Sequence, residues 1–363
     1  MKRQKITLLF GVFMVIVVIA SCGIKKMSDV KEFKLERTNF NDWTNFLEIK
    51  NIIQLQESDQ CLMSSAKKCF FTEKHIIYVD YKANNIYSFS YDGKFEHQVG
   101  RMGHSGSEYV RILDICMDTS DSVIMVLDGR GIVCYDANTG NFLERKKFHS
   151  PDYDNYLLIE PIRDDSFICF TYNDKKNSMV LDYPNGQINL RKRKRYNLCV
   201  NFFYRYNGEC RIISDYGDFY IDSYKDGKLT PLYRIDLGAQ ALPNDILPKT
   251  FEEFMAVDNS PKFFKCITSA YETREWLWLR FVGPKQTYYT AFVNKQNGKY
   301  AFGEESMDMG IYVIGANKEY FYALIYPEFA EQGSLGRKIL EKHNITKNSP
   351  VVVKLKLNEN ILQ

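Results

Sequence analysis

One hairpin-like phrase occurs five times along the 363-residue chain. In each copy, apolar and polar residues alternate, a turn ends in glycine, and a polar and an apolar residue follow. A tight hairpin turn needs a residue with positive φ, which glycine adopts without a Cβ clash. The phrase therefore predicts five β-hairpins. The copies are "IYSFSYDGKF" at 86–95, "IVCYDANTGNF" at 132–142, "MVLDYPNGQI" at 179–188, "FYIDSYKDGKL" at 219–229 and "YTAFVNKQNGKY" at 289–300.

The spacing of these turns indicates the architecture. The turn glycines lie 47, 46, 41 and 71 residues apart, and two further strand-like runs precede each phrase. A period of about 40 to 50 residues with four short strands per unit is typical of β-propellers. Tyr and Phe, at 25 residues each against 10 Pro, also favour half-buried strands. The chain is therefore predicted to be all-β, with four-stranded antiparallel blades.

Two short helices are predicted to interrupt the repeat. Within residues 243–259, four apolar residues recur at i, i+4, i+7 and i+8, which is the spacing of one helix face. A sixth unit begins at about residue 310 and is interrupted by residues 328–343, where we predict the second helix. That unit resumes at residues 349–357.

The sixth unit lacks a fourth strand of its own. The run "IKNIIQLQ" at 49–56 has strand character and belongs to no other unit. Pairing of this run with the C-terminal strands would close the ring and remove an open sheet edge. We therefore predict one six-bladed propeller over residues 49–363, closed by an N-terminal strand and monomeric.

The N-terminus has the features of an export signal. Three basic residues precede an uncharged apolar run, as in a secretory signal peptide over residues 1–21. The segment "IASC" at 19–22 resembles the lipobox of bacterial lipoproteins, which implies cleavage before Cys22 and attachment of diacylglycerol to its thiol. An uncleaved membrane anchor is the alternative, although the run is short for a membrane span.

Both interpretations place the body of the protein outside the cytoplasm. Residues 22–48 are polar and are predicted to be a lipidated tether between the membrane and the propeller. Gly23 stands where an aspartate would retain a lipoprotein at the inner membrane, which points to the outer membrane. The sequence is compatible with either face of that membrane, the periplasmic face or the cell surface.

The stretch from 75 to 148 resembles a family of bacterial six-bladed β-propeller lipoproteins related to NHL-repeat propellers. In that family a glycine-rich loop joins one blade to the next, and Gly100, Gly103, Gly106, Glu108 and Tyr109 match it. Ser107 departs from the family pattern, and the C-terminal "NSPVVVKLKL" resembles the closing strand. The resemblance implies a fold and a lipid anchor and does not imply a reaction.

The loop "GRMGHSGSEYV" at 100–110 is the first candidate site. Its glycine spacing is not that of a dinucleotide fingerprint, and a strand-like segment follows where that fingerprint needs a helix. If the loop lies at the mouth of the central channel, Arg101, His104, Glu108 and Tyr109 become candidate ligand-binding residues. A solvent-exposed connector is the alternative.

A run of cations, "RKRKRY" at 191–196, is the second candidate. Arg191, Lys192 and Arg193 could attract an anionic polysaccharide, lipid headgroups or an acidic protein surface. A solvated strand or loop is the alternative. The chain as a whole is nearly neutral, with 48 Lys and Arg against 45 Asp and Glu, and an exported location disfavours nucleic acid.

Catalysis is disfavoured, and no catalytic residue or cofactor is assigned. The five histidines show no pair at a metal-ligand spacing, and no nucleophile elbow is visible. We interpret Asp80, Asp128 and Asp215 as turn-stabilising residues, and Trp276 and Trp278 as core residues. A metal-dependent lyase or hydrolase with a cation in the channel is the alternative.

Eight cysteines follow Cys22, and none has the C-x-x-C spacing. We interpret them as small buried apolar residues, with a disulfide as the alternative. The leading hypothesis is a lipid-anchored binding or scaffolding module for an envelope protein, a glycan or a peptide.

Overall fold

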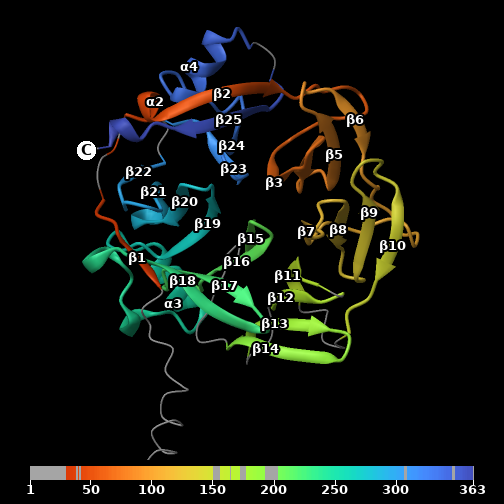
Figure 1. The fold of residues 1–363 in the computed structure, drawn as a ribbon, viewed down its shortest axis with the longest axis horizontal. Coiled ribbons are helices and arrows are strands. Elements are labelled where there is room, and N and C mark those ends of the chain that lie inside the picture. Colours follow the sequence, from red (N-terminus) through yellow and green to blue (C-terminus); the bar gives the residue numbers. More distant parts are fainter. Residues whose placement is uncertain are drawn as a thin grey trace, which may run out of the picture.

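The computed structural model describes residues 30–37, 40, 42–149, 156–163, 165–171, 177–192, 203–305, 309–345 and 348–362. Within these residues, six sheets are arranged around a central axis (Figure 1). Five sheets contain four strands, and one contains five. The predicted six-bladed β-propeller with four-stranded antiparallel blades is confirmed.

We number the blades in chain order and give their strands from the central axis outward. Blade 1 contains β3 (Ala66–Phe71), β4 (His75–Asp80), β5 (Asn85–Ser90) and β6 (Phe95–Gln98). Blade 2 contains β7 (Asp114–Met117), β8 (Val123–Leu127), β9 (Ile132–Asp136) and β10 (Phe142–Lys146). Blade 3 contains β11 (Tyr156–Pro161), β12 (Phe167–Thr171), β13 (Asn177–Tyr183) and β14 (Gly186–Lys192).

The second half of the ring follows the same order. Blade 4 contains β15 (Phe203–Tyr206), β16 (Glu209–Ile213), β17 (Tyr220–Lys225), β18 (Lys228–Asp236) and, outermost, β1 (Lys31–Lys34). Blade 5 contains β19 (Cys266–Glu272), β20 (Trp276–Val282), β21 (Tyr288–Asn294) and β22 (Tyr300–Glu304). Blade 6 contains β23 (Tyr312–Ala316), β24 (Phe321–Ile325), β25 (Val351–Leu357) and β2 (Leu47–Gln54).

The N-terminal strand closes the ring as predicted. β2 pairs antiparallel with β25, from Leu47 opposite Leu357 to Gln54 opposite Val351. Blade 6 is thereby built from both ends of the chain. This pairing covers the edge that β25 would otherwise expose.

Antiparallel order within each blade gives the propeller two distinct faces. The turns between the third and the outer strand, which carry the repeated glycines, lie on one face, which we call the hairpin face. The chain passes from each outer strand to the next inner strand on the opposite face, which we call the connector face. Connections from the second to the third strand also lie on the connector face.

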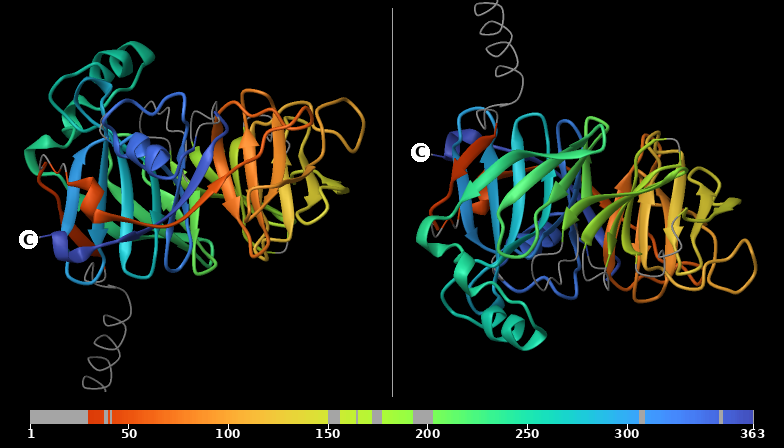
Figure 2. Two further views of the ribbon diagram at one scale, coloured as in Figure 1. Left: turned by 90° about the horizontal axis from the view of Figure 1, so that it is seen from above. Right: turned by 90° about the horizontal axis from the view of Figure 1, so that it is seen from below.

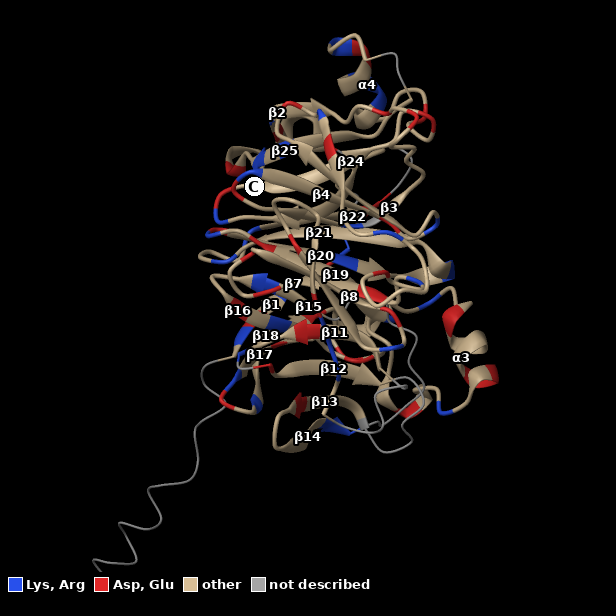
Figure 3. Cartoon of the chain, turned by 90° about the vertical axis from the view of Figure 1, so that its right-hand side faces the viewer, with Lys and Arg blue, Asp and Glu red and all other residues tan. Residues whose placement is uncertain are grey.

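Apolar side chains fill the space between neighbouring blades. Middle strands such as β4 and β8 are buried along almost their whole length, because both of their faces pack against other blades. Between blades 1 and 2, for example, Ile77 and Val79 share one core cluster with Ile115 and Val126. Charged residues of both signs are scattered over the strands and loops (Figure 3).

The two predicted helical insertions are present on the connector face. α3 (Phe251–Asp258) lies between β18 and β19 and follows the 3₁₀ turns Gly238–Gln240 and Asn244–Ile246. The side chain of Thr250 accepts a hydrogen bond from the Glu253 N–H and forms a capping box. α4 (Leu335–Lys342) lies between β24 and β25 and starts at Ser334, whose side chain caps it. Further 3₁₀ turns span Pro284–Gln286 and Glu359–Ile361.

The predicted tether does not extend to residue 48. β1 pairs parallel with β18, and α2 (Trp43–Phe46) packs with its aromatic side chains buried. Between them, the backbone N–H of Glu36 donates to the Tyr300 hydroxyl of blade 5. These short elements lack the periodicity of a strand or helix in sequence, and they form because blades 4 and 5 supply their partners. Residues 22–29 lie outside the described part.

Among the described residues, none of the helices combines the length and the apolar character needed to cross a membrane. The expected signal peptide and Cys22 lie outside this part of the chain.

Candidate ligand-binding site

The 100–110 loop is a connector from β6 to β7. The Arg101 guanidinium pairs with the Glu108 carboxylate at 2.6 Å, and that carboxylate also accepts the Ser105 backbone N–H at 2.9 Å. The Ser105 N–H first, and Arg101 second, lower the pKa of Glu108 to about 2. A Cβ at Gly103 would lie 2.1 Å from Glu108 Oε2. Glu108 therefore holds its own loop together.

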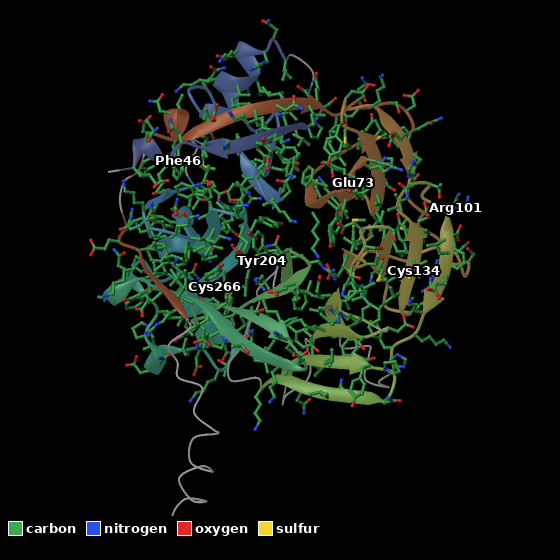
Figure 4. All side chains as sticks on the ribbon, viewed as in Figure 1. Phe46, Glu73, Arg101, Cys134, Tyr204 and Cys266 are labelled. Carbon is green, nitrogen blue, oxygen red and sulfur yellow. The ribbon has the colours of Figure 1, made fainter. Side chains whose placement is uncertain are left out.

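The rest of this loop is anchored to blades 1 and 2. Tyr109 is fully buried, and its hydroxyl donates to the Asn84 carbonyl. The His104 carbonyl accepts from Arg130, and the Glu108 carbonyl accepts from Arg130 and Arg145. Arg101 lies at the outer edge of the ring, away from the axis (Figure 4). The four candidate residues thus belong to one structural connector, and Arg101 points away from the central axis.

Arg191 ties blade 3 to blade 4. Its guanidinium pairs with Asp215 at 3.1 Å and with Asp222 at 2.8 Å, and it also donates to the Ile213 carbonyl. Its side chain is largely buried by these contacts. Lys192 is exposed, and Arg193 lies outside the described residues. Of the basic run, the structure therefore assigns Arg191 to packing between blades.

Two of the strand-end aspartates, Asp80 and Asp128, accept backbone hydrogen bonds at turns, as the sequence indicated. Asp80 accepts hydrogen bonds from the backbone N–H groups of Ser64 and Ala83. Asp128 accepts the N–H of Arg130 and pairs with Arg145. Asp215 is held by Arg191, as described above.

Carboxylates on the inner strands are paired across blade boundaries. Lys68 of β3 pairs with Asp114 of β7 at 2.6 Å, and Arg205 of β15 pairs with Glu160 of β11. Among the described residues, no three His, Cys, Asp or Glu side chains are grouped so as to hold a metal ion.

The described cysteines are buried and free, as predicted from their apolar surroundings. Burial raises the pKa of the Cys61 and Cys134 thiols to about 12, which keeps them protonated and unreactive at neutral pH. Cys199 lies outside the described residues. The buried free cysteines are Cys61, Cys69, Cys116, Cys134, Cys169, Cys210 and Cys266.

A pocket of about 420 Å³ opens between blades 5, 6 and 1, which is a volume typical of small-ligand sites. Its rim comes from strand ends at the connector face: Tyr288 starts β21, Tyr312 starts β23, and Glu305 follows β22. Six aromatic side chains dominate this lining. They are Tyr271, Trp278, Tyr288, Tyr312, Tyr326 and Phe329.

The aromatic side chains form a rigid inner wall and an exposed rim. Tyr271 and Trp278 stack at 5.6 Å with an interplanar angle of 12°, and Trp278 Nε1–H donates to Thr290. At the rim, the exposed fractions are 43% for Tyr288 and 60% for Phe329. Large apolar side chains exposed around a hollow are typical of binding sites.

One ion pair supplies the charge in the pocket. The Arg280 guanidinium pairs with Glu305 at 2.5 Å and stacks over the Tyr288 ring at 4.0 Å from its centroid. Burial raises the pKa of Glu305 above its ordinary value, and Arg280 offsets part of that rise. The hydroxyl groups of Thr268 and Ser269 line the same pocket. The site thus combines ring faces with a donor, an acceptor and hydroxyls.

A second hollow, of about 660 Å³, lies on the outside of blade 6 between β2 and α4. Lys338, Lys342 and His343 line it together with the edge of β2. None of its described lining residues is aromatic apart from the histidine ring. Because the first hollow combines aromatic and polar groups, we assign the ligand site there and name it the aromatic pocket.

The sequence interpretation missed the aromatic pocket. Trp278 was interpreted only as a core residue, and it is indeed buried. The available signal was the set of aromatic residues at strand ends on the connector face, such as Tyr288, Tyr312 and Phe329.

The fold and the pocket define the class: a six-bladed β-propeller that presents a ligand-sized pocket on its connector face. The chain belongs to the family described as "Domain of unknown function (DUF4934)", whose model matches residues 30–360. Its sequence matches no curated protein. The propeller fold implied by the resemblance in sequence is confirmed, whereas the lipid anchor and the relation to NHL-repeat propellers stay predictions.

Two crystal structures from Bacteroides are similar in fold. One, from Bacteroides fragilis, is described as a candidate exported protein; it is 17% identical, with a TM-score of 0.74 over 91% of this chain and 99% of that chain. The other, a member of the DUF4221 family from Bacteroides vulgatus, is 11% identical, with a TM-score of 0.60 over 86% of this chain and 99% of that chain. At these identities the likeness concerns the fold alone.

Proposed function

We propose that the protein is an exported, lipid-anchored binding module that takes an extracellular glycan into the aromatic pocket. The observation that carries this proposal is the convergence of six aromatic side chains from blades 5 and 6 around a hollow of about 420 Å³. Blade 1 completes the wall through Ser65 and Ala66.

The chemistry of the pocket favours a sugar over a purely apolar ligand. The C–H faces of a pyranose ring pack on aromatic faces, and the exposed rings of Tyr288 and Phe329 offer such faces. Sugar hydroxyl groups both donate and accept hydrogen bonds. The Arg280 guanidinium can donate to them and the Glu305 carboxylate can accept from them. A hydrocarbon ligand would exclude water from this ion pair without offering it a hydrogen bond.

Binding is favoured over hydrolysis. Glycosidases commonly use two carboxyl groups on opposite sides of the scissile bond. Among the described lining residues, Glu305 is the carboxylate of the pocket, and it is already engaged by Arg280. The described lining residues can therefore orient a sugar, and they offer one carboxyl group rather than two.

Export and anchoring are supported by the N-terminal sequence. The basic residues, the apolar run and the "IASC" segment precede the first described residue. The likeness to a candidate exported protein of Bacteroides fragilis is consistent with this location. The proposed ligand would accordingly be a glycan outside the cytoplasm.

The test is calorimetric titration of the protein lacking residues 1–22 with soluble oligosaccharides of neutral hexoses, N-acetylhexosamines and uronic acids. We expect Tyr288→Ala and Phe329→Ala to weaken binding about tenfold or more, equivalent to about 1.4 kcal/mol. Phe251→Ala is the matched control, because Phe251 is 54% exposed and lies on α3 outside the pocket.

Two results would contradict the glycan proposal. One is the absence of heat with every oligosaccharide class at millimolar concentration. The other is binding that both rim variants leave unchanged, since the ligand would then lie elsewhere.

A further inference from the structure

The direction of β1 shows from which side the chain enters the propeller. β1 is parallel to β18, with Lys31 opposite Tyr233 and Lys34 opposite Asp236. β18 starts directly after the turn at Gly227 and therefore runs from the hairpin face to the connector face. β1 runs the same way, so the chain arrives at Lys31 from the hairpin side.

A second contact places Lys31 beside the hairpin face of blade 5. The Lys31 ammonium donates to the carbonyl of Lys295. Lys295 belongs to the turn between β21 and β22 that ends at Gly298. The entry point of the chain is thus close to the glycine turn of blade 5.

This entry point is held firmly. Phe33 and Leu35 are almost fully buried, and the Leu35 N–H donates to the Asp236 carbonyl at 2.9 Å. Arg37 then lies over the Tyr289 ring of blade 5. The segment from residue 31 onward therefore cannot lengthen the tether without breaking packed contacts.

The aromatic pocket lies on the opposite face. Its rim residues occupy strand ends on the connector side, as described above for Tyr288, Tyr312 and Glu305. α3 projects from that same side (Figure 2). The entry point and the pocket are separated by the thickness of a blade, which for the seven residues of β20 is about 23 Å.

We infer that the lipid on Cys22 turns the hairpin face toward the membrane and presents the aromatic pocket, with α3, away from it. This inference rests on the proposed lipid anchor. Cys22 lies nine residues before Lys31, which allows a reach of at most about 30 Å and a typical span of about 17 Å. The thickness of the blade, about 23 Å, takes up most of this maximal tether length. The tether is therefore too short for the pocket to contact the lipid surface.

The glycine turns of blades 4 and 5, on the hairpin face, fit a lipid surface in charge as well. Lys225, Lys228 and Lys299 are exposed on these turns, with Asp226 as an acidic neighbour. Lysines near anionic headgroups are attracted to them. This attraction would act in the same direction as the tether.

The orientation can be tested independently of natural lipidation. A chain that begins at Cys22 couples selectively to a thioester lipid in phosphatidylcholine vesicles, because the reaction needs an N-terminal cysteine. A fluorescent amino acid is placed at Lys228, on the hairpin face of blade 4, or at Glu252, on α3 after the same blade. Both side chains are exposed. Nitroxide headgroup lipids then quench whichever probe lies near the membrane.

We expect quenching of the probe at Lys228 to exceed that at Glu252 at least threefold. Equal quenching, or the reverse order, would overturn the inference. A variant with 20 additional Gly and Ser residues between Cys22 and Lys31 should bring the ratio toward one. An unchanged ratio in that variant would show that the short tether is not the cause.

The proposed function is tested separately. Mass spectrometry of Cys22 in protein extracted from cell membranes reports whether the anchor exists, and an unmodified thiol would overturn both the anchor and the orientation. Glycan binding is measured on the soluble protein, so that a failure of binding leaves the orientation result intact.

Discussion

Gly93 and Gly227 occupy equivalent turns, but their surroundings differ. Both have positive φ, at 83° and 76°. A Cβ at Gly93 would lie 2.0 Å from the Gln54 carbonyl oxygen of β2, whereas a Cβ at Gly227 meets nothing within 4 Å. We expect Gly227→Ala to lower the free energy of unfolding by about 1 to 2 kcal/mol through backbone strain alone. Gly93→Ala should cost clearly more, because the closing strand must move as well.

Urea unfolding of the two variants beside the parent protein measures this difference. If both variants lost the same free energy of unfolding, the close contact between Gly93 and Gln54 of β2 would add no cost beyond backbone strain.

The Glu108 carboxyl group gives a prediction about pH. Its pKa is lowered from 4.5 to about 2, first by the Ser105 N–H and then by Arg101. A carboxylate with a lowered pKa stabilises the folded state above its unfolded pKa, so this contribution is complete above about pH 5 and is lost as the pH falls toward 2. In Arg101→Met, the pKa should rise only part of the way, because the backbone donor remains.

Carbon-13 NMR titration of glutamate-labelled protein reads this pKa directly. Lys94→Met, which removes an exposed lysine of the blade 1 hairpin, is the control and should leave the Glu108 titration unchanged. A return to the ordinary value in Arg101→Met would instead make the arginine the main cause.

At the scale of elements, the local sequence was sufficient to predict a strand wherever its partner strand follows directly in the chain. The five glycine hairpins and the helices at 243–259 and 328–343 were predicted because turn chemistry and periodicity lie within about ten residues. β1 and α2 have only four residues each and no repeating pattern. Their partners, β18 and blades 5 and 6, are distant in sequence, so no local signal could reveal them.

The strand β1 makes a prediction that separates a tether from a packed element. Leu35, directly after β1, is 1% exposed, whereas Leu62, in the connector before β3, is 67% exposed. We expect Leu35→Ala to lower the free energy of unfolding by about 2 to 5 kcal/mol. Leu62→Ala should change it by less than about 0.5 kcal/mol. Chemical denaturation of both variants is the measurement. If Leu35→Ala left the free energy of unfolding unchanged, residues 30–36 would have to be counted as part of the tether.

The aromatic residues at strand ends were visible in the sequence, but their convergence into one pocket could not be predicted, for the same physical reason. The Ala66 N–H donates to the Tyr326 hydroxyl at 2.7 Å across 260 positions of sequence. Such contacts arise only when the ring closes. The candidate residues of the 100–110 loop and Arg191 make structural contacts at two different blade boundaries.

At the scale of the whole molecule, β2 is expected to control cooperativity. A chain that begins at residue 57 lacks β2, α2 and β1 and leaves the edge of β25 exposed. We expect it to lose the sharp thermal transition and to aggregate, because an open edge and an uncovered core promote pairing with other chains. Circular dichroism melting and light scattering are the measurements.

A chain that begins at residue 30 keeps all described elements and is the control. We expect it to melt in one transition. If the shorter chain melted at the same temperature, ring closure would not be a source of stability.

The closing strand also fixes the order of events during synthesis. β2 emerges among the first 54 residues, yet its partner β25 is not complete until residue 357. Contacts between such distant segments form slowly, because a long loop must close first. Blades 1 to 5 can pair their strands as they emerge. β2, in contrast, keeps unpaired backbone N–H and C=O groups until β25 is available. Completion of the propeller therefore waits until β25 has been synthesised and is available to pair with β2.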